Sequence, residues 1–209
     1  MLSGLPLSDL KQQAWRREVA KVDLSLDLTK FSLSIEEIIS ITEREGVDAR
    51  LITNAAELLF GPFEGRDNRN KLLAKDSILL VQGLEQYFKS VRRLILSHFD
   101  FIPAWQLDDV MGSVNCNPAS CGAHFDQYDV FLLQHTGEKK WHFDETVHCD
   151  DDLDENSEIR LLKNFSPSSE IVAREGDLIY VPPGVGHHGL AERESITLSI
   201  GVRNPTPIE

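Results

Sequence analysis

Apolar positions in the first hundred residues recur at helical spacing in two places. Ser34 and Glu37 form the pattern of a capping box, apolar residues follow at steps of three and four, and Gly46 supplies a stop. This pattern predicts a helix over residues 34–45. Residues 77–98 carry leucines, aromatics and isoleucines at the same spacing and predict a second, longer helix.

Other segments favour strands and loops. Residues 22–28 alternate apolar and polar side chains and residues 48–53 form a short apolar run, so both are predicted strands. Residues 61–75 are polar and glycine-bearing, which predicts a loop. From about residue 107 onward, short apolar or alternating runs are separated by Gly, Pro, Asn and Asp: 128–134, 139–143, 159–162, 177–183 and 196–203.

Strands at this spacing are typical of an antiparallel sandwich or barrel. We therefore expect a mainly β fold with an N-terminal α part, in which a helical and strand region, residues 1–106, packs on a compact β-barrel, residues 107–209. The two parts are expected to form one integrated domain, because the length of 209 residues suits a single core and no internal repeat is visible.

Composition excludes several classes of function. The net charge of −13 argues against binding of bare nucleic acid, which needs clustered Lys and Arg, but it is compatible with a basic protein partner. No run approaches the ~20 apolar residues of a membrane helix, and the first residues lack the features of a secretory signal. The three cysteines are too few for a disulfide framework, so a reducing cytoplasm is the expected location.

The acidic charge is concentrated in one segment. Residues 144–158 contain eight of the 34 acidic residues and no Lys or Arg. Two interpretations remain open at this point: a solvated loop between strands, or a patch that attracts a basic partner.

The candidate chemistry rests on His124, Asp126 and His187. Residues i and i+2 of a strand point to the same face, so His124 and Asp126 can aim at one point, and a histidine from a distant strand would complete a 2-His-1-carboxylate set for non-heme Fe(II). The alternative is that both histidines are ordinary barrel residues with hydrogen-bond partners. His188 competes with His187, but neighbouring strand residues face opposite ways. A zinc site on Cys116 and Cys121 with His124 lacks a fourth ligand, so the two cysteines are interpreted as packing residues.

Two strings carry a family resemblance. GAHFDQYDVFLLQHTGEKKW (122–141) followed by GDLIYVPPGVGHHG (176–189) resembles the JmjC-type cupin oxygenases, and within them the bacterial ribosomal oxygenases that hydroxylate an arginine of a large-subunit ribosomal protein. A weaker resemblance covers most of the chain. It implies a double-stranded β-helix (cupin, jelly-roll) barrel with flanking helices.

The resemblance also implies a site. It places Fe(II) on His124, Asp126 and His187, with His187 preferred to His188 because the family's histidine closes the PPG-x-x-H turn. A basic residue, here Lys139, would pair with the distal carboxylate of the cosubstrate 2-oxoglutarate. The bacterial arginine hydroxylases tend to have arginine there. Lysine supplies the same positive charge, but as a compact ammonium and not as the bidentate donor pair of a guanidinium.

Three further residues are expected near this site. Asn115 matches a position where the family has a small polar residue near 2-oxoglutarate, and Thr197 follows His187 on the next strand. Tyr128 is expected either to line the substrate cleft or to belong to the barrel core.

The expected activity is hydroxylation of a protein side chain with Fe(II), 2-oxoglutarate and O₂, on an arginine of a basic ribosomal protein. Two departures from the family stand out. Ala191 replaces an asparagine common among cupins, and the sequence stops at Glu209, just after the expected barrel, where the family continues with a helical dimerisation region and a winged-helix domain, so no oligomeric state is predicted. The alternatives are a metal cupin that does not use 2-oxoglutarate, a JmjC-type lysine demethylase, and a non-catalytic binding module.

Overall fold

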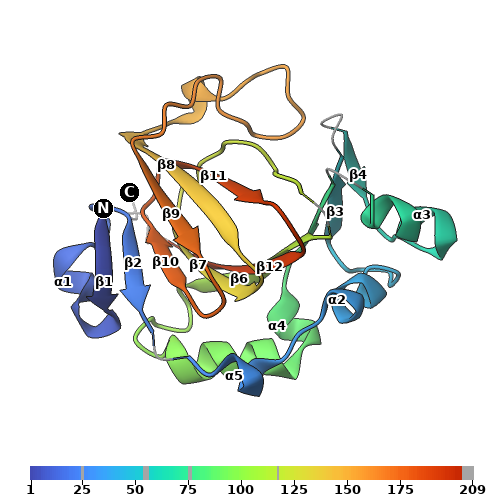
Figure 1. Cartoon of the computed structure of the whole chain (residues 1–209), viewed down its shortest axis with the longest axis horizontal. Helices are drawn as coiled ribbons and strands as arrows, with labels where there is room; N and C mark the ends of the chain where they lie inside the picture. Colours follow the sequence, from blue (N-terminus) through green and yellow to red (C-terminus); the bar gives the residue numbers. More distant parts are fainter. Residues whose placement is uncertain (25, 54–56, 75–76, 117, 204–209) are drawn as a thin grey trace.

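The computed structural model describes residues 1–203 except 25, 54–56, 75–76 and 117. Strands dominate it and form two sheets that face each other (Figure 1). The larger sheet has nine strands in the order β1-β2-β10-β7-β12-β6-β5-β3-β4, and the smaller has three in the order β11-β8-β9. Helices cover the outer face of the larger sheet (Figure 1).

The larger sheet contains strands from the N-terminal, middle and C-terminal parts of the chain. Its central strands run antiparallel: β10 (Leu178–Val181), β7 (Asp129–Thr136), β12 (Ser195–Val202) and β6 (Leu107–Asn115). The N-terminal residues extend it at both edges. On one edge lie β1 (Leu2–Pro6) and β2 (Ala20–Asp23), and on the other lie β5 (Ile78–Val81), β3 (Ala49–Ile52) and β4 (Leu58–Phe60). The expected division of the chain into an N-terminal region, residues 1–106, and a barrel, residues 107–209, stays a prediction.

The smaller sheet consists of β11 (Val185–Ala191), β8 (Lys139–Val147) and β9 (Ser169–Ala173). On β11, His187 lies opposite Phe143 and Gly189 lies opposite Trp141. Because opposed residues of an antiparallel pair share a face, these four side-chain positions face the larger sheet, together with Lys139. The intervening residues, His188 among them, face outward.

The core has two layers because the larger sheet is buried on both faces. Phe131 and Leu133 of β7 belong to the cluster shared with the helices, whereas Val130 and Leu132 pack between the two sheets with Trp141. This double burial explains why residues 128–134 read as a nearly continuous apolar run and not as an alternating one.

The helical layer is formed by short helices. α2 (Ile35–Ile41) begins at Ser34, whose side chain accepts from the Glu37 N–H while Glu37 accepts from the Ser34 N–H, which confirms the capping box. The helix ends earlier than predicted, at Ile41. The other helices are α1 (Leu10–Gln13), α3 (Gly65–Leu72), α4 (Leu84–Tyr87) and α5 (Lys89–His98), with 3₁₀ turns at Leu7–Asp9, Leu28–Phe31 and Asp150–Asp152.

Several expectations about local structure were wrong. The segment 77–98 is not one helix: β5 occupies its start, Gly83 turns the chain with φ of +67°, and α4 and α5 follow. The segment 61–75 contains α3, and residues 159–162 form no strand beyond an isolated bridge at Leu162.

Other expectations hold in part. The strand predicted over residues 22–28 is β2, which ends at Asp23, and residue 25 lies outside the described residues. The mainly β, cupin-like architecture with N-terminal helices is as expected, but the two sheets are not joined into a closed barrel. Among the described helices, none combines the length and the apolar character needed to cross a membrane.

Candidate active site

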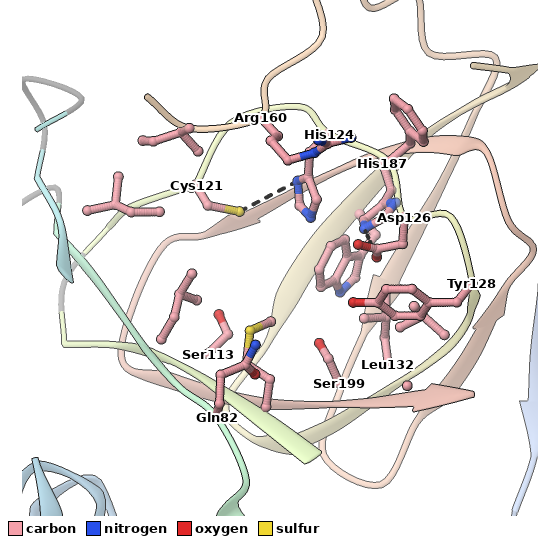
Figure 2. Close-up of a pocket in the computed structure, with 18 of the residues that line it drawn as sticks. Gln82, Ser113, Cys121, His124, Asp126, Tyr128, Leu132, Arg160, His187 and Ser199 are labelled. Carbon is pink, nitrogen blue, oxygen red and sulfur yellow. Dashed lines mark hydrogen bonds and ion pairs between the residues drawn. The ribbon is translucent and has the colours of Figure 1, made fainter. Parts of the chain in front are cut away.

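A cavity opens between the two sheets, at the end where β11 and the segment before β7 meet (Figure 2). Its wall includes Met111 and Ser113 of β6, Ser199 of β12 and Lys139 of β8. All three predicted metal ligands line the same cavity, and so does Tyr128. The inner faces of strands from both sheets therefore converge on one site.

His124, Asp126 and His187 form a compact cluster. One potential ligand atom from each lies within 4.8 Å of the others, and His187 Nε2 is 3.6 Å from Asp126 Oδ2. The two imidazole rings have centroids 4.3 Å apart. Two imidazoles and one carboxylate are a donor set that suits Fe(II) and leaves positions open for other ligands. The residues present thus fit the metal that the sequence implies.

The backbone that presents the cluster differs from the expectation. His124 and Asp126 do not lie on a regular strand but on an extended segment that precedes β7. His124 forms an isolated bridge with His187, with N···O distances of 3.1 and 2.7 Å. The Asp126 carbonyl accepts from the Gly184 N–H at 2.8 Å. These bonds attach the segment to β11 and to the residue before it. They hold the Asp126 carboxylate and the His124 imidazole close to the side chain of His187.

Hydrogen bonds at the outer nitrogens orient both imidazoles. His187 Nδ1 lies 3.1 Å from the Val185 carbonyl, and His124 Nδ1 lies 3.0 Å from the Gly122 carbonyl. A carbonyl oxygen accepts only, so each Nδ1 donates and each Nε2 is left to face the cluster. Such bonds are the usual support of metal-binding histidines.

The protonation states are compatible with cation binding. Burial, with the charge of His124, lowers the pKa of His187 to about 4, so its imidazole is neutral. Burial also lowers the pKa of His124, but the interactions with Cys121 and Asp126 outweigh burial and raise this pKa to about 9. A bound cation requires the neutral imidazole, so metal binding is expected to release the His124 proton.

His188 points away from this cluster. It lies opposite His142 on the outer face of β8 and contacts the ring of Phe165, with centroids 5.9 Å apart. The geometry therefore brings His187, and not His188, to the candidate metal centre.

Lys139 occupies the interior of the cavity. The side chain is 2% exposed, and Nζ donates to Ser113 Oγ at 3.1 Å and to Asn115 Oδ1 at 3.4 Å. Burial lowers the pKa of Lys139 to about 8. Within the part of the chain that the structure describes, no ion pair involves this ammonium group. Lys140, the next residue, is exposed as expected.

The remaining predicted residues lie in different environments. Asn115 is fully buried and contacts Lys139 through its Oδ1. Thr197 is also buried, but its hydroxyl donates to Gln134 Oε1 at 2.9 Å and it is not among the residues that line the cavity. Tyr128 is 37% exposed and lines the cavity beside Asp126, so it belongs to the mouth and not to the core (Figure 2).

Sequence reasoning missed several cavity residues. Ser113 and Trp141 each lie two positions from a predicted residue on the same strand, so strand alternation could have identified them. Asp109 lies on the same face of β6, six positions before Asn115, so the same alternation applies to it, whereas Arg160 carries no such signal. Cys121 lies beside the metal cluster, with Sγ 3.8 Å from His124 Nδ1.

The acidic segment 144–158 runs from the end of β8 into the loop at the top of the view (Figure 1). Asp150 accepts from Gln127 at 2.9 Å and pairs with Arg160 at 2.7 Å, and Arg160 lines the cavity. Asp144 lies 3.3 Å from His148, and Asp152 accepts from the Cys149 N–H. Several of these acids therefore have partners within the protein, although Asp150 and Arg160 are both exposed, and the two interpretations of the segment stay predictions.

Comparisons with known proteins find a matching family model and several similar proteins. Residues 94–209 match the model of the JmjC domain. The chain is 35% identical over 178 residues to a protein of Haemophilus influenzae named probable ribosomal oxygenase, covering 81% of this chain and 43% of that protein. It is 27% identical over 208 residues to the ribosomal protein uL16 3-hydroxylase of Escherichia coli, covering 96% and 53%.

A solved structure shows the same fold. The E. coli ribosomal oxygenase YcfD in complex with cobalt and 2-oxoglutarate superposes with a TM-score of 0.78 at 26% identity, covering 96% of this chain and 52% of that one. The chain thus spans about half the length of the relatives that it matches.

Proposed function

Because the chain belongs to the JmjC domain family, we propose that it is an Fe(II)- and 2-oxoglutarate-dependent oxygenase that hydroxylates an arginine of a ribosomal protein. One observation carries this proposal. A 2-His-1-carboxylate cluster shares a cavity with a buried lysine that has no carboxylate partner among the described residues. The cluster suits a metal with open positions, and the ammonium suits the free end of a dicarboxylate.

The residues have distinct proposed roles. His124, Asp126 and His187 would hold the iron, which supplies the oxidative chemistry together with O₂ and 2-oxoglutarate. Lys139 would neutralise the distal carboxylate of the cosubstrate, and Asn115 would orient Lys139. Thr197 would contribute through its bond to Gln134 and not by direct contact.

The mouth of the cavity supports a cationic substrate side chain. Tyr128 and Asp109 both line it, and burial, reinforced by Asp108, raises the pKa of Asp109. A guanidinium group can pair with the carboxylate and stack on the phenol ring. The names of the two relatives point to ribosomal proteins, which are basic and made in the cytoplasm, so a cytoplasmic location goes with this proposal.

The test is turnover of ribosomal-protein peptides with Fe(II), 2-oxoglutarate and O₂, followed by mass spectrometry and a succinate assay. Arginine peptides should gain one oxygen atom, whereas matched peptides with lysine or histidine at that position should not. A gain on the lysine or histidine peptide instead would refute the arginine assignment and leave the oxygenase assignment standing.

Variants test the site itself. His124→Ala and Asp126→Ala should abolish turnover, and Lys139→Ala should raise the KM for 2-oxoglutarate sharply while His188→Ala has little effect. Turnover by the first two variants at the parent's rate would contradict the metal assignment. An unchanged KM in the Lys139 variant would favour a metal enzyme that does not use 2-oxoglutarate.

A further inference from the structure

Two buried hydrogen-bond donors, one in the cavity wall and one beside it, lack acceptors among the described residues. Trp141 lines the cavity and is 4% exposed, Asn115 is fully buried in contact with Lys139, and the unpartnered atoms are the Trp141 Nε1 and the Asn115 Nδ2. Both lie next to Lys139: Asn115 contacts it directly, and the Lys139 Nζ is 5.1 Å from the centroid of the Trp141 ring. Three groups that donate hydrogen bonds thus gather at one place.

The position of Trp141 is fixed by its surroundings. Lys139 and Trp141 stand two residues apart on β8, so both side chains point between the sheets. Gly189 lies opposite Trp141 on β11, and a Cβ there would come within 2.8 Å of the indole and 2.9 Å of Lys139 Cε. The absence of a side chain at residue 189 is what allows indole and ammonium to lie side by side.

Packing alone does not explain an indole here. Trp141 belongs to the inner core cluster, where phenylalanine or leucine would fill space without a polar atom. A buried donor that loses water and gains no acceptor costs the fold about 1–3 kcal/mol. Two such donors lie beside an ammonium that has no anionic partner in the described part of the chain, which is the arrangement expected where a bound anion supplies the acceptors.

We propose that Trp141 is a cosubstrate-binding residue whose Nε1–H donates to the carboxylate that Lys139 neutralises. A carboxylate offers about four lone-pair positions, enough for Nζ of Lys139, Nδ2 of Asn115 and Nε1 of Trp141 together. The inference rests on the proposed function, since it assumes that 2-oxoglutarate is the dicarboxylate bound here. It adds to that function a neutral donor that fixes the distal carboxylate beside the ammonium.

The first experiment is a calorimetric titration of the Zn(II)-loaded protein with 2-oxoglutarate, which needs no turnover. Trp141→Phe keeps a flat ring near Lys139 and removes only the N–H and part of the ring. The Kd for 2-oxoglutarate should rise about tenfold, as for loss of a hydrogen bond to a charged group. Trp105→Phe is the matched control, since Trp105 is 68% exposed, and its Kd should equal the parent's.

A second probe locates the contact. 2-Oxobutyrate keeps the keto acid end of 2-oxoglutarate and lacks the distal carboxylate, so Trp141→Phe should leave its Kd unchanged. Equal weakening of both ligands would overturn the assignment to the distal carboxylate. Equal 2-oxoglutarate affinity in parent and variant would overturn the role of Trp141 while the proposed function stands. A parent protein that does not bind 2-oxoglutarate refutes the proposed function itself.

A third measurement follows binding in the parent protein and needs the variant only to assign a signal. The chain has three tryptophans, so the ¹⁵N-labelled parent gives three indole N–H signals, and the one missing in Trp141→Phe is that of Trp141. Addition of 2-oxoglutarate to the Zn(II)-loaded parent should move this signal downfield, as expected for a new hydrogen bond to a carboxylate. A signal that stays in place at saturation contradicts the proposal.

Discussion

Replacing Lys139 with methionine is expected to stabilise the metal-free fold while destroying the cosubstrate site. The lysine is 2% exposed and donates only to neutral oxygens of Ser113 and Asn115. An ammonium group in such a place has lost most of its hydration and has gained no opposite charge. Methionine has a similar length, no charge and enough flexibility to fill the same volume.

The magnitude follows from the pKa of Lys139, which burial lowers from 10.5 to about 8. Each tenfold loss of proton affinity corresponds to about 1.4 kcal/mol, so burial disfavours the ammonium form by roughly 3 kcal/mol. Methionine removes this cost but leaves Ser113 and Asn115 without their donor, a loss of about 1 kcal/mol. The variant should therefore be more stable than the parent by about 2 kcal/mol near neutral pH.

The stability difference between Lys139→Met and its parent should change with pH in one direction. Below about pH 8 the lysine is charged in both folded and unfolded chains, and the whole penalty acts on the parent. Between about pH 8 and 10.5 the folded chain has lost the proton and the unfolded chain keeps it, so the parent gains stability as the pH rises. The advantage of Lys139→Met should consequently shrink by about 2 kcal/mol at about pH 9.5.

Urea unfolding at about pH 7 and about pH 9.5, followed by far-UV circular dichroism, measures both effects. Lys140→Met is the control, because Lys140 is exposed on the opposite face of the same strand and should show no such pH dependence. A Lys139→Met protein less stable than its parent near neutral pH, or an advantage that does not change with pH, would refute the desolvation argument. The affinity of the Lys139→Met variant for 2-oxoglutarate should fall at least about 100-fold, because the ammonium that pairs with the carboxylate is gone.

Three further predictions concern other parts of the molecule. Gly189→Ala should weaken 2-oxoglutarate binding without loss of metal binding, because the new methyl group meets Trp141 and Lys139, and calorimetry checks this. Ser34→Ala should lower the free energy of unfolding by about 1 kcal/mol through loss of the α2 cap, as measured in urea. Neutralising Asp151 should raise the peptide KM and weaken its salt dependence if the acidic segment attracts the substrate, and unchanged kinetics would refute that role.

The sequence predicted those elements whose signal is local. The capping box at Ser34 defined the start of α2, and apolar runs located β7 and β12. It failed over residues 77–98, where a strand and two helices follow one another without a polar break, so that leucines of β5 and α4 coincide with helical spacing. Gly83, which turns the chain there, was the signal that could have separated them.

The site was predictable to the extent that strand alternation determines it. Short spacing brought His124 and Asp126 together and the sequence offered His187 as the third ligand, while the family resemblance preferred His187 to His188 and added Lys139. Arg160 could not be predicted in this way. It reaches the cavity because the loop that carries it is attached to Gln127 through Asp150, and such contacts depend on tertiary packing and not on periodicity.

The cavity combines opposite charges at its two ends, and this arrangement limits what can enter and where it can stay. The interior is lined by the Lys139 ammonium and the Trp141 indole, with Asn115 beside Lys139, and the Trp141 Nε1 and Asn115 Nδ2 lack acceptors among the described residues, so an anion is stabilised there and a cation is not. The mouth offers Asp109 and the phenol ring of Tyr128, which favour a cation, while the exposed Arg160 there is paired with Asp150. A dicarboxylate must therefore pass the acidic mouth to reach its site, whereas a basic side chain is held at the mouth. Since a side chain held at the mouth blocks the way to Lys139, the proposed reaction should require 2-oxoglutarate to bind before the protein substrate.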